Sequence, residues 1–198
     1  MNKDIQSHLK ENRTFAPSKE FSDNARVKSP AEYEALYKES IENPDKFFSE
    51  QAEHNLSWFK KWDKVMEYDF SKVGKEKSYA KFFDGAKINA SYNCLDRQIE
   101  RGLGDKPAII WQGEKEDESI TYTYNELKKE VCRFANVLKK HGAKKGTVVT
   151  VYLPMITELP IACLACARIG AIHSVVFSAF SAEALASRIN DCLSLIHI

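Results

Sequence analysis

Two β-prone runs decide the fold, Thr147-Val-Val-Thr-Val-Tyr-Leu153 and His173-Ser-Val-Val-Phe177. The first run is continuous and β-branched, as expected for a strand that is buried on both faces. Between the two runs, the segment from Thr157 to Ile169 is apolar nearly all round and ends at Gly170, which predicts a buried helix. Strands joined by a helix of this length run parallel, usually through a right-handed crossover, so the stretch predicts a parallel sheet.

The alternation of strands and helices continues in both directions. Downstream, Ser181 can cap a third helix that contains Leu185. Upstream, residues 107–112 and 119–122 are short β-prone runs separated by a charged connector. This arrangement predicts an antiparallel hairpin ahead of the parallel strands.

A longer helix is predicted directly after this hairpin. Thr123 and Glu126 stand at the spacing of a capping box, and Gly142 ends the helical pattern. The apolar residues between them recur at a four-three-four spacing that lines one helical face. They are Leu127, Val131, Phe134 and Leu138. Together these elements predict the opening strands and helices of a layered α/β domain over residues 89–192.

The region before this domain has a different pattern. Residues 1–28 are polar and aperiodic, which predicts a mobile leader. Ser29, Pro30 and Glu32 give a sharp helix start, and residues 29–88 are predicted to form a helical extension that packs on the α/β domain. Its second half is rich in aromatic residues, and packing is favoured over base stacking because no basic groove accompanies them. No strand signal in this region is long enough to form a sheet.

Composition argues against nucleic-acid and membrane binding. The 198 residues include 29 Lys and Arg against 28 Asp and Glu, and the formal charge of +1 provides no electrostatic footprint for either. The first residues contain no apolar signal-peptide core, and the apolar stretches are shorter than a membrane span. The 5 cysteines are an odd number spread through apolar segments, which predicts reduced thiols and a cytoplasmic protein.

Few chemical motifs stand out. Cys163 and Cys166 have a CxxC spacing, but they fall inside a predicted helix without a partner pair, so packing is favoured over a metal or redox role. The glycines form neither a GxGxxG nor a P-loop pattern. The His173 imidazole can act as a base, but no Asp or Glu stands at a spacing that would identify it as the partner orienting the ring. A packing or capping role is therefore favoured. No metal ligand is therefore assigned.

Two segments are candidate ligand sites. The loop Phe177-Ser-Ala-Phe-Ser181 joins a parallel strand to a helix start, where backbone N–H groups and the helix dipole can meet a phosphate. Its spacing fits a functional loop and a tight turn equally well. Asp96 and Arg97, in the polar run 89–98, have groups that bind ligands, but a structural hydrogen-bonding role at a domain junction is favoured for them.

Four phrases, taken in order, resemble the acetyl-CoA synthetase family of acyl-adenylate-forming enzymes. The first is the run from Ser29 through Phe70. The others are Lys87-Ile-Asn-Ala-Ser-Tyr-Asn-Cys-Leu-Asp-Arg97, Ile120-Thr-Tyr-Thr-Tyr-Asn-Glu-Leu127 and Ala162-Cys-Leu-Ala-Cys-Ala-Arg-Ile-Gly-Ala-Ile-His-Ser-Val-Val-Phe177. The resemblance extends from about Ser29 to Asp191 and corresponds to the N-terminal portion of that family.

The resemblance implies an ATP-dependent acetate–CoA ligase. Acetate and ATP would give an acetyl-adenylate and pyrophosphate, and the acetyl group would then pass to CoA, with Mg²⁺ screening the phosphates. In the family the catalytic groups lie beyond the last residue of this chain, so no catalytic residue is assigned. The segment matching Phe177, Ser178 and Ala179 lies on the side of the CoA nucleotide and usually carries a glycine pair where Ser178 and Ala179 stand. ATP, CoA and Mg²⁺ are therefore expected for a full-length member, and none is expected to bind tightly to this chain.

The last six residues do not resemble the continuation of the family. We therefore predict a truncated sequence that is inactive alone, with a non-family tail at residues 193–198. Three alternatives remain open. The first is a noncatalytic interaction module, and the second is a fragment of a related propionyl- or acetoacetyl-CoA synthetase. The third is a standalone nucleotide-binding protein.

Overall fold

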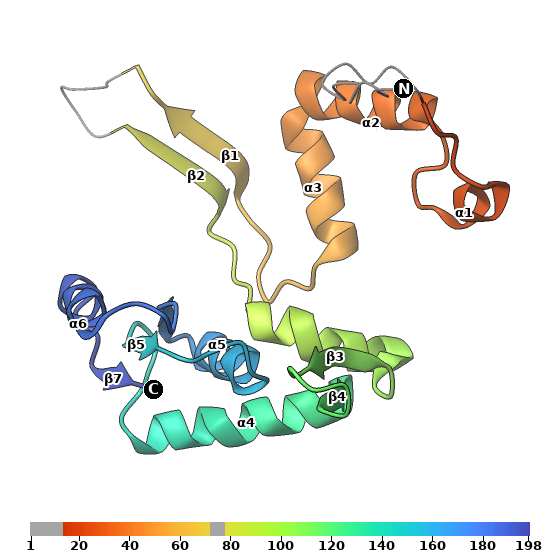
Figure 1. Ribbon diagram of the computed structural model, residues 1–198. Coiled ribbons are helices and arrows are strands. Elements are labelled where there is room, and N and C mark those ends of the chain that lie inside the picture. Colours follow the sequence, from red (N-terminus) through yellow and green to blue (C-terminus); the bar gives the residue numbers. More distant parts are fainter. Residues whose placement is uncertain (1–13, 72–77) are drawn as a thin grey trace, which may run out of the picture. The chain divides into compact units, whose positions relative to one another are not determined.

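The computed structural model of the protein describes residues 14–71 and 78–198 (Figure 1). The chain divides into two compact units, Met1–Ala52 and Glu53–Ile198. The division falls inside helix α3 (Pro44–Asn55), and so differs from the boundaries predicted after residues 28 and 88. The two boundaries remain predictions. They separate domains of the sequence, and such a boundary need not coincide with the border of a compact unit.

The described residues of the first unit are mostly helical. It contains α1 (Lys19–Asn24), α2 (Pro30–Glu42) and most of α3. Residues 19–24 of the predicted mobile leader form α1, which begins where the Ser18 hydroxyl accepts a hydrogen bond from the Phe21 N–H at 3.2 Å. The predicted leader residues 1–13 lie outside the described part of the chain.

Helix α2 begins at the predicted residue, with one difference in its cap. The Ser29 hydroxyl accepts a hydrogen bond from the Glu32 N–H at 3.2 Å, as a capping box requires. The Glu32 carboxylate, however, accepts from the Lys28 N–H at 2.8 Å, one residue before the expected donor. Both contacts still satisfy N–H groups at the start of the helix.

A β-hairpin in the second unit contradicts the prediction that residues 29–88 contain no sheet. Strand β1 (Lys64–Asp69) pairs antiparallel with β2 (Tyr79–Asp84). The strands are short and mix charged with apolar residues, so their periodicity in sequence is weak. In register, Lys64 faces Asp84 and Glu67 faces Lys81, and the Tyr79 hydroxyl donates to the Glu67 carboxylate at 2.7 Å across the hairpin.

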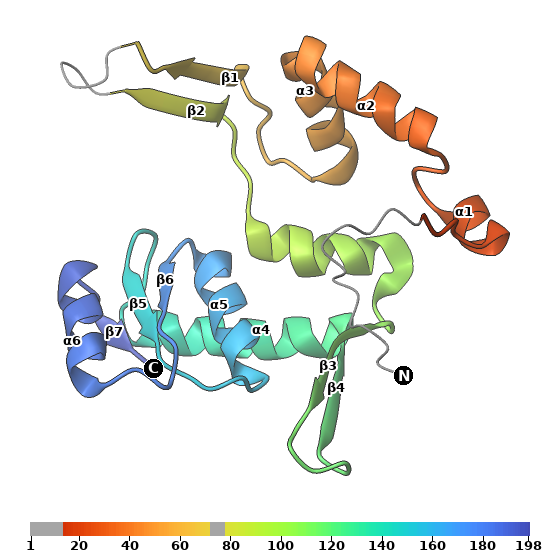
Figure 2. The same ribbon diagram turned by 45° about the horizontal axis from the view of Figure 1, so that its top comes forward.

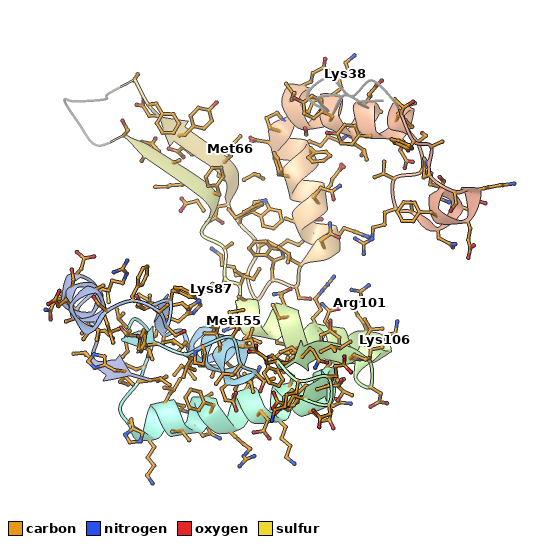
Figure 3. All side chains as sticks on the ribbon, viewed as in Figure 1. Lys38, Met66, Lys87, Arg101, Lys106 and Met155 are labelled. Atoms are coloured by element: carbon orange, nitrogen blue, oxygen red, sulfur yellow. The ribbon has the colours of Figure 1, made fainter. Side chains whose placement is uncertain are left out.

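The second predicted hairpin is confirmed. Strand β3 (Pro107–Gln112) pairs antiparallel with β4 (Ser119–Thr123). The indole N–H of Trp111 donates to the Met155 carbonyl at 2.7 Å, which connects β3 to the loop after β5. Figure 3 labels Met155 among the side chains of this unit.

Helix α4 (Tyr124–Lys140) follows β4 directly and has the predicted capping box. The Thr123 hydroxyl accepts from the Glu126 N–H at 3.2 Å, and the Glu126 carboxylate accepts from the Thr123 N–H at 2.9 Å. Leu127, Val131 and Leu138 of the predicted apolar face are buried, and Phe134 packs against them partly exposed. The periodicity of this helix therefore predicted its core face.

Thr123→Ala is expected to lower the free energy of unfolding by about 1 kcal/mol, because it removes both the side-chain acceptor and the anchor of the Glu126 carboxylate. Urea unfolding of the chain, followed by circular dichroism, measures the change. Thr14→Ala is the control, since Thr14 is an exposed threonine outside any helix. Equal stabilities for the two variants would show that the cap contributes nothing.

The parallel sheet has the predicted direction. Strand β5 (Val148–Val151) pairs parallel with β6 (Ile172–Val175), and Val149 faces His173. Helix α5 (Glu158–Ile169) joins the two strands and ends at Gly170, which has a left-handed φ of 75°. Figure 2 shows α4 running beside α5 and β5.

The core lies between α4, α5 and the central strand. Val149 and Val151 of β5 are fully buried, and Leu95 joins them from the helical segment before β3. Helix α5 buries Ala165 and Cys166, whereas several of its other side chains are only partly covered. The expectation of a helix covered all round is thus met on one side only.

Helix α6 (Ala182–Asp191) and strand β7 (Ile196–His197) complete the described chain. The Ser181 hydroxyl caps α6 by accepting from the Ala184 N–H at 3.3 Å, as predicted. Strand β7 pairs parallel with β5 on the side opposite β6, which gives the order β6-β5-β7. Residues 193–198, predicted to be foreign to the family sequence, therefore contribute a strand to the sheet of this unit.

Candidate functional site

The candidate ligand loop lies beyond the carboxyl end of β6. It begins at Phe177, and the Phe180 N–H donates to the Phe177 carbonyl at 3.1 Å to close a turn. Phe177 and Ala179 are exposed and Ser178 is half-buried. Ser181 then caps α6, so the loop runs directly into a helix start.

One tyrosine holds this loop. Tyr152 is the first residue after β5, and its hydroxyl lies 2.6 Å from the Ser178 carbonyl and 2.9 Å from the Phe180 carbonyl. Because β5 and β6 are parallel neighbours, their carboxyl ends meet at the same edge of the sheet, which brings Tyr152 to the loop.

An aromatic pair forms the exposed surface of the loop. The rings of Phe177 and Phe180 pack edge to face, with their centroids 5.9 Å apart. Phe177 keeps 60% of its surface exposed, which is high for a large apolar side chain. The Arg188 guanidinium of α6 lies 4.4 Å above the Phe180 ring, within the range of a cation–π contact. The loop therefore presents the exposed Phe177 ring, with a positive charge over the neighbouring Phe180 ring.

The polar run 89–98 has the favoured structural role. The Asn89 side chain donates to the Ala167 carbonyl at 2.9 Å and so satisfies the C-terminal end of α5. The Asn93 side chain accepts from the Ser57 N–H at 2.7 Å and donates to the Ser57 carbonyl at 3.0 Å. Both amides thus join segments that are far apart in the sequence.

Asp96 is the centre of a mostly buried ion cluster. Its two oxygens accept hydrogen bonds from Arg168 at 2.7 and 3.0 Å, and Lys128 lies 2.8 Å away. The Asp96 side chain is only 10% exposed. The hydrogen bonds from Arg168, and to a smaller extent Lys128, lower the pKa of Asp96 to about 2 although burial opposes the shift. With its oxygens occupied in this way, Asp96 joins α4 and α5 to the helical segment at residues 90–103.

The shifted carboxylate predicts a loss of stability in acid. Because the folded-state pKa of Asp96 is depressed, its contribution is fully present above the unfolded pKa of about 4 and is lost as the pH falls toward 2. The contribution is roughly 2 kcal/mol. Urea unfolding at pH 5 and pH 2.5 is expected to show the stabilities of the native chain and Asp96→Asn converging in acid. A gap between them that is independent of pH would contradict this.

The remaining candidates from the sequence are the cysteines of the CxxC spacing and His173. Burial, and secondly Cys163, raises the pKa of Cys166 to about 11, which disfavours the thiolate needed for metal or redox chemistry. No group of three His, Cys, Asp or Glu side chains within residues 14–71 and 78–198 is arranged to hold a metal ion. His173 lies exposed in β6. In the described ranges no helix is both long and apolar enough to cross a membrane.

A larger pocket of about 490 Å³ lies in the second unit, where residues of the helical segment 90–103, β3, α4 and α5 line it. Its lining includes Arg97, whose guanidinium donates to the His54 carbonyl at 3.2 Å. The other lining residues are mainly apolar or carry amides. Arg97 thus makes a hydrogen bond of the structural kind favoured from the sequence, and a ligand role stays the less favoured alternative.

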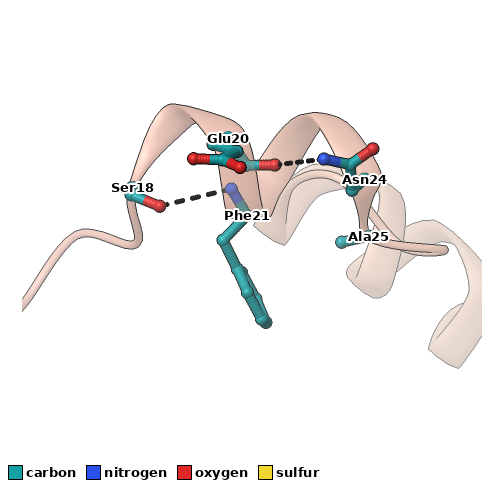
Figure 4. Close-up of a pocket in the computed structure, with 5 residues that line it drawn as sticks. All are labelled: Ser18, Glu20, Phe21, Asn24 and Ala25. Atoms are coloured by element: carbon teal, nitrogen blue, oxygen red, sulfur yellow. Dashed lines mark hydrogen bonds between the residues drawn. The ribbon is translucent and has the colours of Figure 1, made fainter.

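A smaller pocket lies against α1 (Figure 4). It is lined by Ser18, Glu20, Phe21, Asn24 and Ala25. Its polar groups are engaged locally, with Ser18 capping the helix and the Asn24 side chain donating to the Glu20 carbonyl at 2.9 Å. We assign it no function because these contacts belong to the helix itself.

Sequence reasoning found the loop but missed the residues that support it and the neighbouring ion cluster. The sequence places Tyr152 in a β-prone run and does not show which loop its hydroxyl meets. Arg168 carried a usable signal, because it is the only charged residue between Glu158 and the end of an otherwise apolar helix. Such a charge needs a partner, and Asp96 in the polar run was available.

Comparison with known proteins defines the class of the chain. The profile of the family described as AMP-binding enzyme matches residues 95–198, just over half of the sequence. The chain therefore belongs to the AMP-binding enzyme family.

A second match narrows this assignment. Residues 33–94 match the family described as acetyl-coenzyme A synthetase N-terminus, directly before the AMP-binding match. Acetyl-coenzyme A synthetase from Leptospira biflexa is 56% identical over 180 residues, which cover 91% of this chain and 26% of that protein. The enzyme of the same name from Deinococcus radiodurans is 50% identical over 193 residues, covering 98% and 28%. The chain thus matches the N-terminal part of acetyl-coenzyme A synthetases and spans about a quarter of their length.

A solved structure supports the fold. Acetoacetyl-CoA synthetase from Streptomyces lividans superimposes with a TM-score of 0.76, covering 91% of this chain and 29% of that one. The sequence identity is 22%, so this likeness concerns architecture alone. It agrees with the predicted layered α/β fold of an adenylate-forming enzyme.

Proposed function

We propose that this chain forms the N-terminal part of an AMP-forming acetate–CoA ligase. The reaction converts acetate, ATP and CoA into acetyl-CoA, AMP and pyrophosphate through an acetyl-adenylate. The observation that carries the proposal is the 56% identity to an acetyl-coenzyme A synthetase over 91% of the chain, across both matched families. The noncatalytic interaction module is not favoured by these relatives.

ATP and CoA are the proposed nucleotide substrates, and Mg²⁺ the proposed metal. Bound to the phosphates of ATP, Mg²⁺ would offset the charge that builds up on the leaving pyrophosphate. The described residues offer no cluster of acidic and histidine ligands for it, so we assign no residue of this chain to the metal. Catalytic residues are likewise not assigned within these residues.

Phe177, Ser178 and Ala179 are proposed to lie on the side of the CoA nucleotide. In support, Phe177 offers an exposed ring on which an adenine base can stack. Arg188 brings a positive charge to the same surface. Ser178 and Ala179 replace the glycine pair usual in the family, so the backbone of this loop is less free than a glycine backbone.

We propose a cytoplasmic location and small-molecule partners only, without nucleic acid or membrane. In support, the five cysteines are all free thiols, as expected for a reducing compartment. The near-neutral formal charge of +1 gives no general attraction for polyanions.

The proposal is tested with the full product of the gene. Acetate-dependent exchange of labelled pyrophosphate into ATP reports adenylation, and the formation of acetyl-CoA reports the complete reaction. Acetate is expected to support both at a higher kcat/KM than propionate or acetoacetate. A preference for either of those acids would favour a related synthetase, and no exchange with any of them would reject adenylation.

A further inference from the structure

The Tyr152 hydroxyl is shared by two carbonyls of one loop. It lies 2.6 Å from the Ser178 oxygen and 2.9 Å from the Phe180 oxygen. A phenol has a single proton to donate, so the two carbonyls share it in a three-centre hydrogen bond. One side chain at the end of β5 therefore holds the loop after β6 at two points.

These contacts fix the direction of the following N–H groups. In a planar trans peptide, the N–H of each residue points opposite to the carbonyl before it. Since the carbonyls of Ser178 and Phe180 point at Tyr152, the N–H groups of Ala179 and Ser181 are directed away from it. The Phe180 N–H is used inside the turn by the Phe177 carbonyl at 3.1 Å.

The same contacts place the aromatic pair. Phe177 and Phe180 flank the two residues between them, and their edge-to-face packing at 5.9 Å depends on the shape of the turn. Without the tyrosine hydroxyl, the carbonyls would exchange to water and the exposed Phe177 ring would lose its fixed position. The ring of Tyr152 itself does not need to touch a ligand for this effect.

We propose that Tyr152 is a positioning residue for the nucleotide part of CoA. It acts through residues 177–181, which it holds in the conformation that presents the Phe177 ring and the Ala179 N–H. This inference rests on the proposed function, in which the loop meets CoA. It assigns Tyr152 to the second half-reaction and not to adenylation.

The test is Tyr152→Phe in the full product of the gene, which removes one oxygen and keeps the ring. The KM for CoA is expected to rise roughly three- to tenfold, which is the effect of one lost net hydrogen bond. Acetate-dependent pyrophosphate exchange, and its KM for ATP, are expected to stay within about twofold of the native values. Tyr68→Phe, which removes the hydroxyl of an exposed tyrosine in β1, is the matched control.

The outcomes separate this inference from the proposed function. If the native protein shows no acetate-dependent pyrophosphate exchange, the proposed function is rejected, and the proposed role of Tyr152 is rejected as well. Normal exchange with an unchanged KM for CoA in Tyr152→Phe rejects the positioning role alone. A parallel loss of exchange and CoA turnover also rejects it, because that pattern indicates a general structural role.

Hydrogen–deuterium exchange gives a second readout that does not depend on activity. In Tyr152→Phe, peptides covering residues 177–181 are expected to exchange faster, while peptides from α4 keep their native rates. Unchanged rates in the loop would overturn the inference. Faster exchange in both regions would overturn it as well, since the hydroxyl would then stabilise the whole unit.

Discussion

Asp96→Asn is expected to lower the free energy of unfolding at pH 7 by about 3 kcal/mol. The substitution keeps the shape of the side chain but leaves the partly buried charges of Arg168 and Lys128 without their carboxylate. It also weakens two hydrogen bonds of 2.7 and 3.0 Å that join the polar run 89–98 to α5. Urea unfolding of the chain measures the loss.

The matched control is Asp63→Asn. Asp63 pairs with Lys60 at 3.4 Å, but its side chain is 75% exposed, so its loss is expected to cost less than about 1 kcal/mol. A double-mutant cycle with Arg168→Met is expected to give a coupling energy of about 2 kcal/mol. A coupling energy near zero would mean that Asp96 stabilises the fold through groups other than Arg168.

Leu95→Ala is expected to cost about 3 kcal/mol of the free energy of unfolding. Leu95 is only 1% exposed and packs in the same core as Leu127 and Val131. Truncation removes its buried methyl groups and leaves a cavity that the neighbouring helices cannot fully close. The measurement is again urea unfolding, with the m-value monitored for changes in the unfolded state.

Leu193→Ala provides the contrast. Leu193 is 78% exposed, so the same change in side chain is expected to alter stability by less than about 0.5 kcal/mol. If Leu95→Ala lowers the free energy of unfolding as little as Leu193→Ala does, Leu95 lies outside the cooperative core. That result would also contradict the view that the helical segment before β3 folds together with α4.

The elements with strong local signals were predictable from sequence. Helix α4 combined a capping box with a regular apolar face, and β5 was a continuous β-branched run; each is found within a few residues of its expected position. The parallel pairing of β5 and β6 followed from the length of the helix between them. The hairpin β1–β2 was missed because its short strands mix charged and apolar residues. Its cross-strand contacts, such as the Tyr79 hydroxyl with the Glu67 carboxylate, have no periodic signature along one strand.

The candidate site was predictable only in part. The position of the loop at residues 177–181 followed from its place between a strand and a helix. The partners of that loop did not, since Tyr152 precedes Ser178 by an entire helix and strand. In the same way, the polar run 89–98 revealed its hydrogen-bonding capacity, but the choice between ligand and structural partners for Asp96 depended on where Arg168 lies.

The order of the strands has a consequence for where a small molecule can enter. From β5 the chain crosses to β6 on one side and then returns to β7 on the other. The connection after β5 and the connection after β6 therefore run in opposite directions across the sheet, and open α/β sheets bind ligands outside the carboxyl ends of the strands at such a reversal. Tyr152 is the first residue beyond the carboxyl end of β5, so a ligand bound at such a reversal would lie near its phenol.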